Sequence, residues 1–255
     1  MRKIAIPNGS NQHILIVSGA SGSGKTTTCA MLENMYPSEY VHVPFDRSRA
    51  ARPGEFGSRQ VTLESMFEKY HNGEYFNLAQ VTHGGYSAIR TADVNQVFNE
   101  GKVAVLEFPL ESVGELEQAF QGSNISIVEL IPPSEEERFK RLKSGHKFTD
   151  QRIESDQWGA GRLDRYKGGN LLTLDDHDLT LITETNRLDE TVQRIHKFMQ
   201  VQRLTPMHLT DIEKQGPEAV KNLLRAVNIG GHDCLKSGSL EKVDKEFFID
   251  RLNMK

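Results

Sequence analysis

The feature that most constrains this chain is a glycine-rich segment directly after a short apolar run. Residues 14–17 read Ile-Leu-Ile-Val, and residues 19–26 read Gly-Ala-Ser-Gly-Ser-Gly-Lys-Thr. This spacing is the P-loop pattern, in which glycines let backbone amides wrap a polyphosphate while the lysine reaches its β- and γ-phosphates. The pattern therefore predicts a strand, a phosphate-binding loop and a helix that together bind a nucleoside triphosphate.

Individual P-loop residues have distinct expected roles. Lys25 is the expected catalytic cation, and the hydroxyl of Thr26 is the expected ligand of Mg²⁺. The helix that begins near Lys25 directs the positive end of its dipole toward the bound phosphates. Together these features make ATP with Mg²⁺ the expected cofactor pair. The residues expected to bind this nucleotide are Gly19, Ser21, Gly22, Ser23, Gly24, Lys25, Thr26 and Thr27.

Composition argues against a membrane protein and a secreted protein. The chain of 255 residues is 37% hydrophobic, and no apolar run approaches the roughly 18 residues that a membrane helix needs. The N-terminal residues lack the apolar core of a signal peptide, so we expect a cytoplasmic protein with no membrane partner. A net charge of −4 argues against nucleic acid as a partner, although a local basic groove is compatible with it. The pattern gives no indication of oligomeric state.

The two cysteines, Cys29 and Cys234, lie far apart in the sequence. No second cysteine pair or histidine spacing accompanies them, so the spacing indicates neither a disulfide framework nor a zinc site. We expect simple thiols.

The order of apolar patterns predicts an α/β fold with a parallel sheet flanked by helices. Short apolar runs predict buried strands, three-to-four spacing predicts helices, and Ser134 with Glu137 forms a capping-box pattern at one helix start. The expected strands are 14–17, 103–108, 125–131 and 179–183, and the expected helices are 26–35, 63–72, 92–100, 134–143 and 188–202.

The sequence changes character after Leu204, where Thr205-Pro206 forms a break. Two amphipathic helices are expected beyond it, at 211–227 and 240–252. We therefore expect a main domain over 1–204 and a helical C-terminal appendage over 205–255.

Several later segments follow the P-loop in a fixed order. They read Arg-Ala-Ala-Arg-Pro-Gly-Glu at 49–55, Asn-Gly-Glu-Tyr-Phe-Asn at 72–77, His-Gly-Gly-Tyr-Ser-Ala at 83–88 and Asp-Leu-Thr-Leu-Ile-Thr at 178–183. Over about residues 12–200, this succession resembles the guanylate kinase family. The resemblance implies a P-loop kinase with a nucleoside-monophosphate-binding subregion and a lid. The implied reaction transfers the γ-phosphoryl group of Mg-ATP to a nucleoside or deoxynucleoside monophosphate.

The resemblance implies that Arg49, Arg52 and Tyr86 hold the acceptor's phosphate, and it places Glu55 in the same substrate-binding segment. The planar fork of arginine suits a phosphate better than the point charge of lysine, which agrees with this role. A solvated basic loop is the alternative interpretation of the two arginines.

The positions that read the base depart from the family pattern. Phe45 and Asp46 fall where the family has serine and threonine hydroxyls, and Asn77 stands at its acidic residue. An amide both donates and accepts, so Asn77 suits a base that offers an acceptor beside a donor. Adenine-like purines, 2-aminoadenine or a modified nucleobase fit this description, with Phe45 stacking on the ring. The expected acceptor is purine-like, with altered base specificity as a hypothesis.

Two further groups complete the expected catalytic machinery. The family's lid arginines correspond to Arg141 and Arg152. Glu107 retains one carboxylate where the family has two, since Pro109 replaces the second, and Asp46 is an additional carboxylate candidate.

Two alternative functions stay open at this point. One is a kinase of a modified nucleotide, a nucleic-acid end or another phosphorylated metabolite. The other is a guanylate-kinase-like module that binds a protein, although the retained Gly24, Lys25 and Thr26 favour an enzyme.

Overall fold

A computed structural model shows how the chain folds, and it describes residues 12–49, 57–81, 85–108, 112–144, 179–184 and 186–203. The chain divides into two compact units, residues 1–188 and 189–255. Helix α7 (Leu188–Gln202) has the bounds predicted from sequence, and residues 189–203 are the described part of the second unit. The boundary predicted after Leu204 and the appendage predicted over 205–255 lie outside the described residues.

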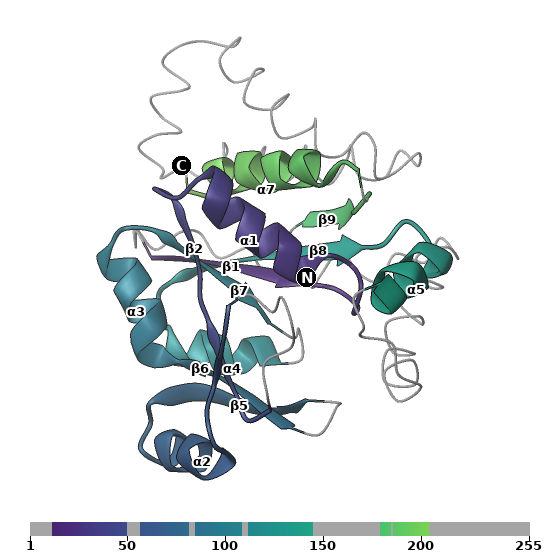
Figure 1. Ribbon diagram of the computed structural model, residues 1–255. Coiled ribbons are helices and arrows are strands. Elements are labelled where there is room, and N and C mark those ends of the chain that lie inside the picture. Colours follow the sequence, from purple (N-terminus) through teal and green to yellow (C-terminus); the bar gives the residue numbers. More distant parts are fainter. Residues whose placement is uncertain are drawn as a thin grey trace, which may run out of the picture. The chain divides into compact units, whose positions relative to one another are not determined.

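The first unit is built on a parallel sheet with the strand order β2-β7-β1-β8-β9 (Figure 1). Four of its strands confirm the apolar runs that predicted them, and β2 is an addition. The register sets Val17 of β1 beside Glu107 of β7, so the P-loop leaves the sheet next to that carboxylate. The strands are β1 (His13–Ser18), β2 (Tyr40–His42), β7 (Val103–Glu107), β8 (Asn124–Ile131) and β9 (Leu179–Ile182).

Helices cover both faces of this sheet. Helix α1 (Lys25–Met35) packs on one face, against β1, β2 and β7. On the opposite face, α3 (Thr91–Asn99) and α4 (Val113–Ala119) bury apolar side chains in a shared core. Figure 1 shows α1 on the other side of the strands from α3 and α4. The core residues on that second face include Ile14, Ile16, Val94, Val97, Ala104, Leu106, Val113 and Leu116.

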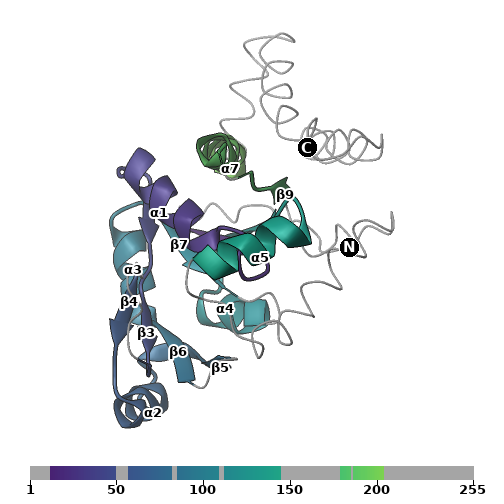
Figure 2. The same ribbon diagram turned by 45° about the vertical axis from the view of Figure 1, so that its right-hand side comes forward.

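A smaller sheet with the order β4-β3-β6-β5 lies at one end of the first unit (Figures 1 and 2). It was not predicted from the sequence, because two of its strands span three residues and carry no long apolar run. Helix α2 (Leu63–His71) packs against β5, and Met66 is fully buried there. The strands are β3 (Phe45–Arg47), β4 (Ser58–Gln60), β5 (Tyr75–Val81) and β6 (Gly85–Arg90).

The five helices predicted before residue 204 are confirmed within one or two residues at each end, whereas α4 was not predicted. The helices predicted at 211–227 and 240–252 lie outside the described residues. Helix α5 (Glu135–Ser144) begins as its capping pattern indicates, since the Glu137 amide donates to Ser134 Oγ at 3.1 Å. In the described part of the chain, every helix is too short or too polar to cross a membrane.

Candidate active site

The P-loop connects β1 to α1 at the carboxyl edge of the main sheet. Its three glycines all have positive φ angles: 136° at Gly19, 84° at Gly22 and 96° at Gly24. A Cβ atom at Gly19 would lie 2.2 Å from the carbonyl oxygen of Leu130, so only glycine fits there. The backbone conformation of the loop thus accounts for the glycine spacing of the sequence.

Lys25 lies over the loop that precedes it. Its Nζ donates to the carbonyl oxygens of Gly19 at 2.8 Å and Ala20 at 3.0 Å. The ammonium group is therefore held at the concave backbone where a P-loop gathers phosphate oxygens.

Thr26 and Glu107 form the oxygen-rich part of the site. Thr26 Oγ1 donates to Glu107 Oε2 at 2.9 Å, which joins the first turn of α1 to the end of β7. Hydroxyl and carboxylate oxygens are the hard ligands that Mg²⁺ prefers, and Mg²⁺ commonly keeps several waters. The residues present therefore fit a magnesium ion held by Thr26 and, through water, by Glu107.

The surroundings of Glu107 favour the ionised form of its carboxyl group. Burial raises its pKa, but the close contact with His42, the charge of Lys25 and the hydrogen bond from Thr26 together lower it below the ordinary value. His42 Nε2 lies 3.4 Å from Glu107 Oε1. Sequence reasoning missed His42, and its one local signal is a histidine inside the apolar run 40–43.

Of the two predicted lid arginines, Arg141 lies against the P-loop. Its guanidinium donates to the carbonyl oxygens of Gly22 at 3.3 Å and Thr183 at 2.7 Å, and to Thr183 Oγ1 at 3.1 Å. Thr183 Oγ1 donates in turn to the Ser23 carbonyl at 2.7 Å. Arg141 and the end of β9 are thereby fastened to the phosphate-binding loop. Arg152 lies outside the described residues.

Arg49 and Tyr86, two of the residues predicted to hold the acceptor phosphate, lie on neighbouring segments of the backbone in the small sheet. Ser48 and Tyr86 exchange hydrogen bonds between β3 and β6, from the Ser48 amide to the Tyr86 carbonyl at 3.0 Å and from the Tyr86 amide to Ser48 Oγ at 2.8 Å. Arg49 follows Ser48 and lies beside Gly85. A Cβ atom added to Gly85 would lie 3.6 Å from the Cβ of Arg49. Arg52 and Glu55 lie outside the described residues.

Asn77 on β5 has a partner that the sequence did not indicate. Its Nδ2 donates to Glu115 Oε2 of α4 at 2.5 Å, and its side chain is buried while Glu115 is exposed. A carboxylate accepts but does not donate, so this contact fixes which end of the amide faces Glu115. The two residues are 38 positions apart, and no local signal links them.

Asp46 is fully buried at the centre of the small sheet. Arg59 Nε donates to its Oδ1 at 2.7 Å, and Arg90 Nε and the Tyr75 hydroxyl donate to its Oδ2. Burial raises the pKa of Asp46, but these hydrogen bonds and the charge of Arg59 outweigh it and hold the pKa below its ordinary value. Its carboxylate therefore joins strands of the small sheet, and a substrate contact stays a prediction.

Phe45, also predicted to contact the substrate, is 6% exposed and belongs to the apolar core. The guanidinium of Arg47 lies over its ring, 5.5 Å from the centroid. Stacking on a base stays a prediction that requires this ring to become accessible.

Comparison with known proteins identifies the family to which this site belongs. The family model for guanylate kinase matches residues 11–202. The chain belongs to the guanylate kinase family. The guanylate kinase of Trichormus variabilis is 28% identical to it over 180 residues, which are 69% of this chain and 85% of the relative. That of Geobacter sulfurreducens is 28% identical over 145 residues, 55% of this chain and 68% of the relative.

A solved structure supports the same fold. The crystal structure of guanylate kinase from Anaplasma phagocytophilum superposes with a TM-score of 0.53 at 20% identity, covering 76% of this chain and 87% of that one. The resemblance, the P-loop α/β fold and the enzyme class predicted from the sequence are confirmed. The protein is a phosphotransferase of the nucleoside monophosphate kinase class.

Proposed function

We propose that this chain transfers the γ-phosphoryl group of Mg-ATP to a purine-like nucleoside or deoxynucleoside monophosphate. The observation that carries the proposal is the hydrogen bond from Thr26 to Glu107, because it unites the P-loop with a carboxylate at the carboxyl edge of the sheet. This edge is where the donor nucleotide and its acceptor meet in α/β folds of this kind. The family membership of the chain supports the same reaction.

On the donor side, the catalytic task is positioning and charge stabilisation. Lys25 lies where it neutralises the β- and γ-phosphates, and Arg141 reaches the loop from α5. Magnesium, when bound, offsets the charge of the phosphate oxygens. An oxygen of the acceptor phosphate bonds to the γ-phosphorus while the bond to the bridging oxygen breaks, which releases ADP.

On the acceptor side, Arg49, Arg52 and Tyr86 are proposed to hold the phosphate. The hydrogen bonds that join Ser48 to Tyr86 support this, since Arg49 directly follows Ser48 and Tyr86 lies on β6 of the same small sheet. An arginine fork and a phenol give several donors to one phosphate and fix its direction toward the γ-phosphorus.

The base is proposed to be read by Asn77 together with Glu115. One amide hydrogen of Asn77 is used by Glu115, which leaves its carbonyl oxygen, its second amide hydrogen and the other carboxylate oxygen for a ligand. This set accepts from an exocyclic amino group and donates to a ring nitrogen or carbonyl. A purine that carries an amino group fits it, and Glu115 of α4 supplies the carboxylate that is absent at position 77.

The test is product formation with a panel of monophosphates. Purified protein is incubated with Mg-ATP and the ribo- and deoxy-forms of AMP, GMP, IMP, CMP and UMP or dTMP, and diphosphates are measured by mass spectrometry. We expect a purine with an amino group to give the highest kcat/KM. We expect Lys25→Met to lower kcat by about 100-fold or more, because it removes a cation from the transferred phosphate. Lys102→Met is the matched control.

Base reading is tested separately with Glu115→Gln. We expect this change to lower kcat/KM for the preferred acceptor by about 10-fold or more while the KM for ATP is unchanged, because the amide no longer accepts at both oxygens. Glu117→Gln, on the same helix, is the control. A pyrimidine as the best acceptor would contradict the proposed base pocket. Absence of any Lys25-dependent product would contradict the proposed kinase substrate class.

A further inference from the structure

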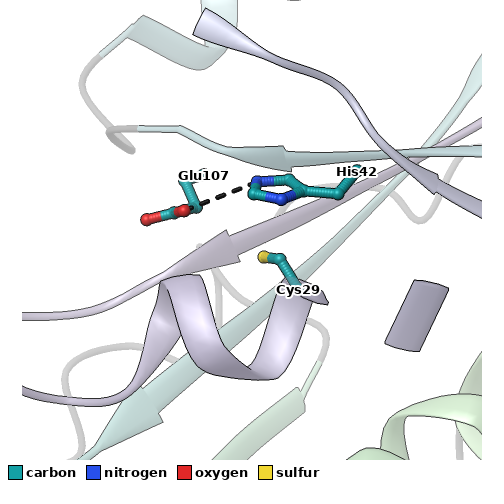
Figure 3. Close-up of side chains that lie close together, drawn as sticks. All are labelled: Cys29, His42 and Glu107. Carbon is teal, nitrogen blue, oxygen red and sulfur yellow. Dashed lines mark ion pairs between the residues drawn. The ribbon is translucent and has the colours of Figure 1, made fainter. Parts of the chain in front are cut away.

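Three side chains of different chemical types lie close together where α1, β2 and β7 meet. Cys29 comes from α1, His42 from the end of β2 and Glu107 from the end of β7, and Figure 3 shows the thiol directed toward the histidine–glutamate pair. One ligand atom from each, the thiol sulfur, an imidazole nitrogen and a carboxylate oxygen, all lie within 4.8 Å of one another.

We propose that Cys29, His42 and Glu107 form a zinc site that lies beside the phosphate-binding loop. Sulfur, imidazole nitrogen and carboxylate oxygen are the three protein ligand types of Zn²⁺, and three of them leave one position for water. The mixture with sulfur disfavours Mg²⁺ and Ca²⁺, which take oxygen ligands. The ligand set therefore points to Zn²⁺. Its binding releases the thiol proton of Cys29 to solvent.

The distances fit a tetrahedral ion after a small adjustment. Metal–ligand distances of about 2.0–2.3 Å place neighbouring ligand atoms about 3.4–3.7 Å apart in a tetrahedron. His42 Nε2 and Glu107 Oε1 are already 3.4 Å apart. The remaining adjustment is a shift of about 1 Å by the thiol sulfur, which one side-chain rotation supplies.

The three side chains lie largely inside the protein. Cys29 is fully buried and His42 is 4% exposed, so both come to the ion from the protein interior. The side chain of Glu107 is 13% exposed, so its carboxylate has some contact with solvent.

Zinc at this site is also expected to affect phosphoryl transfer. This effect rests on the proposed function, whereas zinc binding itself does not. Glu107 Oε2 accepts from Thr26 Oγ1, and an ion on Glu107 competes for the carboxylate that faces the proposed magnesium position. Zinc is therefore expected to inhibit the kinase reaction, and a chelator is expected to restore it.

Zinc binding is tested on the full chain with Co²⁺ as a spectroscopic substitute. We expect one equivalent of Co²⁺ to bind with a thiolate-to-cobalt charge-transfer band and to be displaced by Zn²⁺. Cys29→Ser is expected to remove the band and to weaken Zn²⁺ binding by more than about 100-fold. Cys234→Ser and His71→Gln, which change the same residue types elsewhere, are expected to keep both.

One further measurement makes the outcome decisive. X-ray absorption of the zinc-loaded wild-type chain needs no variant, and one sulfur ligand is expected in the coordination shell. No bound metal, a shell without sulfur, or a band lost in Cys234→Ser but kept in Cys29→Ser would overturn the site. If zinc binds through Cys29 but the zinc-free protein phosphorylates no monophosphate, the proposed function fails while the zinc site stands.

Discussion

Gly19 shows how one residue limits the P-loop. Its φ of 136° is unfavourable for side chains, and an added Cβ would meet the Leu130 carbonyl oxygen at 2.2 Å. That carbonyl belongs to β8, so neither the loop nor the strand can move without disturbing the sheet beneath the site. Gly101 also has a positive φ, of 69°, but nothing lies within 4 Å of its Cβ position.

This contrast gives the first prediction. Gly19→Ala is expected to lower the free energy of unfolding by more than about 2 kcal/mol and to weaken nucleotide binding, because strain and a backbone clash combine. Gly101→Ala has only the cost of placing a side chain at a positive φ angle. We expect it to lower the free energy of unfolding by about 1 kcal/mol and to leave nucleotide affinity unchanged. Chemical denaturation and a fluorescent nucleotide titration measure both quantities. Equal effects of the two changes would refute the role assigned to the clash.

At the scale of elements, Asp46 holds the small sheet together. Arg59 from β4, Tyr75 from β5 and Arg90 from β6 all donate to this one carboxylate of β3. Arg59 also pairs with Asp93 of α3, which extends the network toward the helix that covers the main sheet. Short strands with few ladder hydrogen bonds are thereby joined through side chains.

The lowered pKa of Asp46 predicts a pH dependence of stability. Because the folded-state pKa lies below the ordinary value of 3.8, Asp46 stabilises the fold fully above about pH 4 to 5. That contribution is lost as the pH falls through the lower folded-state pKa. We expect Asp46→Asn to destabilise the protein by about 3 kcal/mol at pH 7 and by progressively less below pH 4.

Denaturant unfolding at a series of pH values measures this difference. Glu100→Gln is the control, because Glu100 also has a lowered pKa, from hydrogen bonds with Lys102 and Gln96, but lies on the surface. Its effect on stability is expected to be small at every pH. A gap between wild type and Asp46→Asn that stays constant down to pH 2 would show that the network does not depend on this ionisation.

At the scale of the whole molecule, ligand binding and folding are linked. The P-loop contacts reach β7 through Glu107, α5 through Arg141 and the end of β9 through Thr183. A nucleotide that binds this loop therefore stabilises the elements that carry the site as well as the loop itself.

This linkage predicts that Mg-ATP raises the free energy of unfolding. A nucleotide concentration 100-fold above Kd is expected to add about 2.7 kcal/mol to the free energy of unfolding. Thermal and denaturant unfolding with a non-hydrolysable ATP analogue measure it. Lys25→Met is expected to require a higher nucleotide concentration for the same shift, whereas Lys102→Met is expected to match wild type. An identical response of all three proteins would contradict nucleotide binding at the P-loop.

The features that the sequence determined by itself are those encoded in consecutive residues. The P-loop and the helix after it are specified within 22 positions, 14–35, because the apolar run, the glycines and the lysine act on adjacent backbone. The long buried strands of the main sheet follow from their apolar runs, since a strand covered on both faces needs no partner to be recognised. The cap of α5 at Ser134 is equally local.

Tertiary structure decided the features that depend on residues far apart in the sequence. The small sheet forms because three-residue segments find partners and Asp46 joins them, which no local pattern contains. Glu115 reaches Asn77 only because α4 packs on β5. Cys29 carried no zinc-site spacing, yet α1, β2 and β7 bring its thiol to His42 and Glu107. Strand pairing and helix packing set these contacts, and both depend on the folded chain rather than on neighbouring residues.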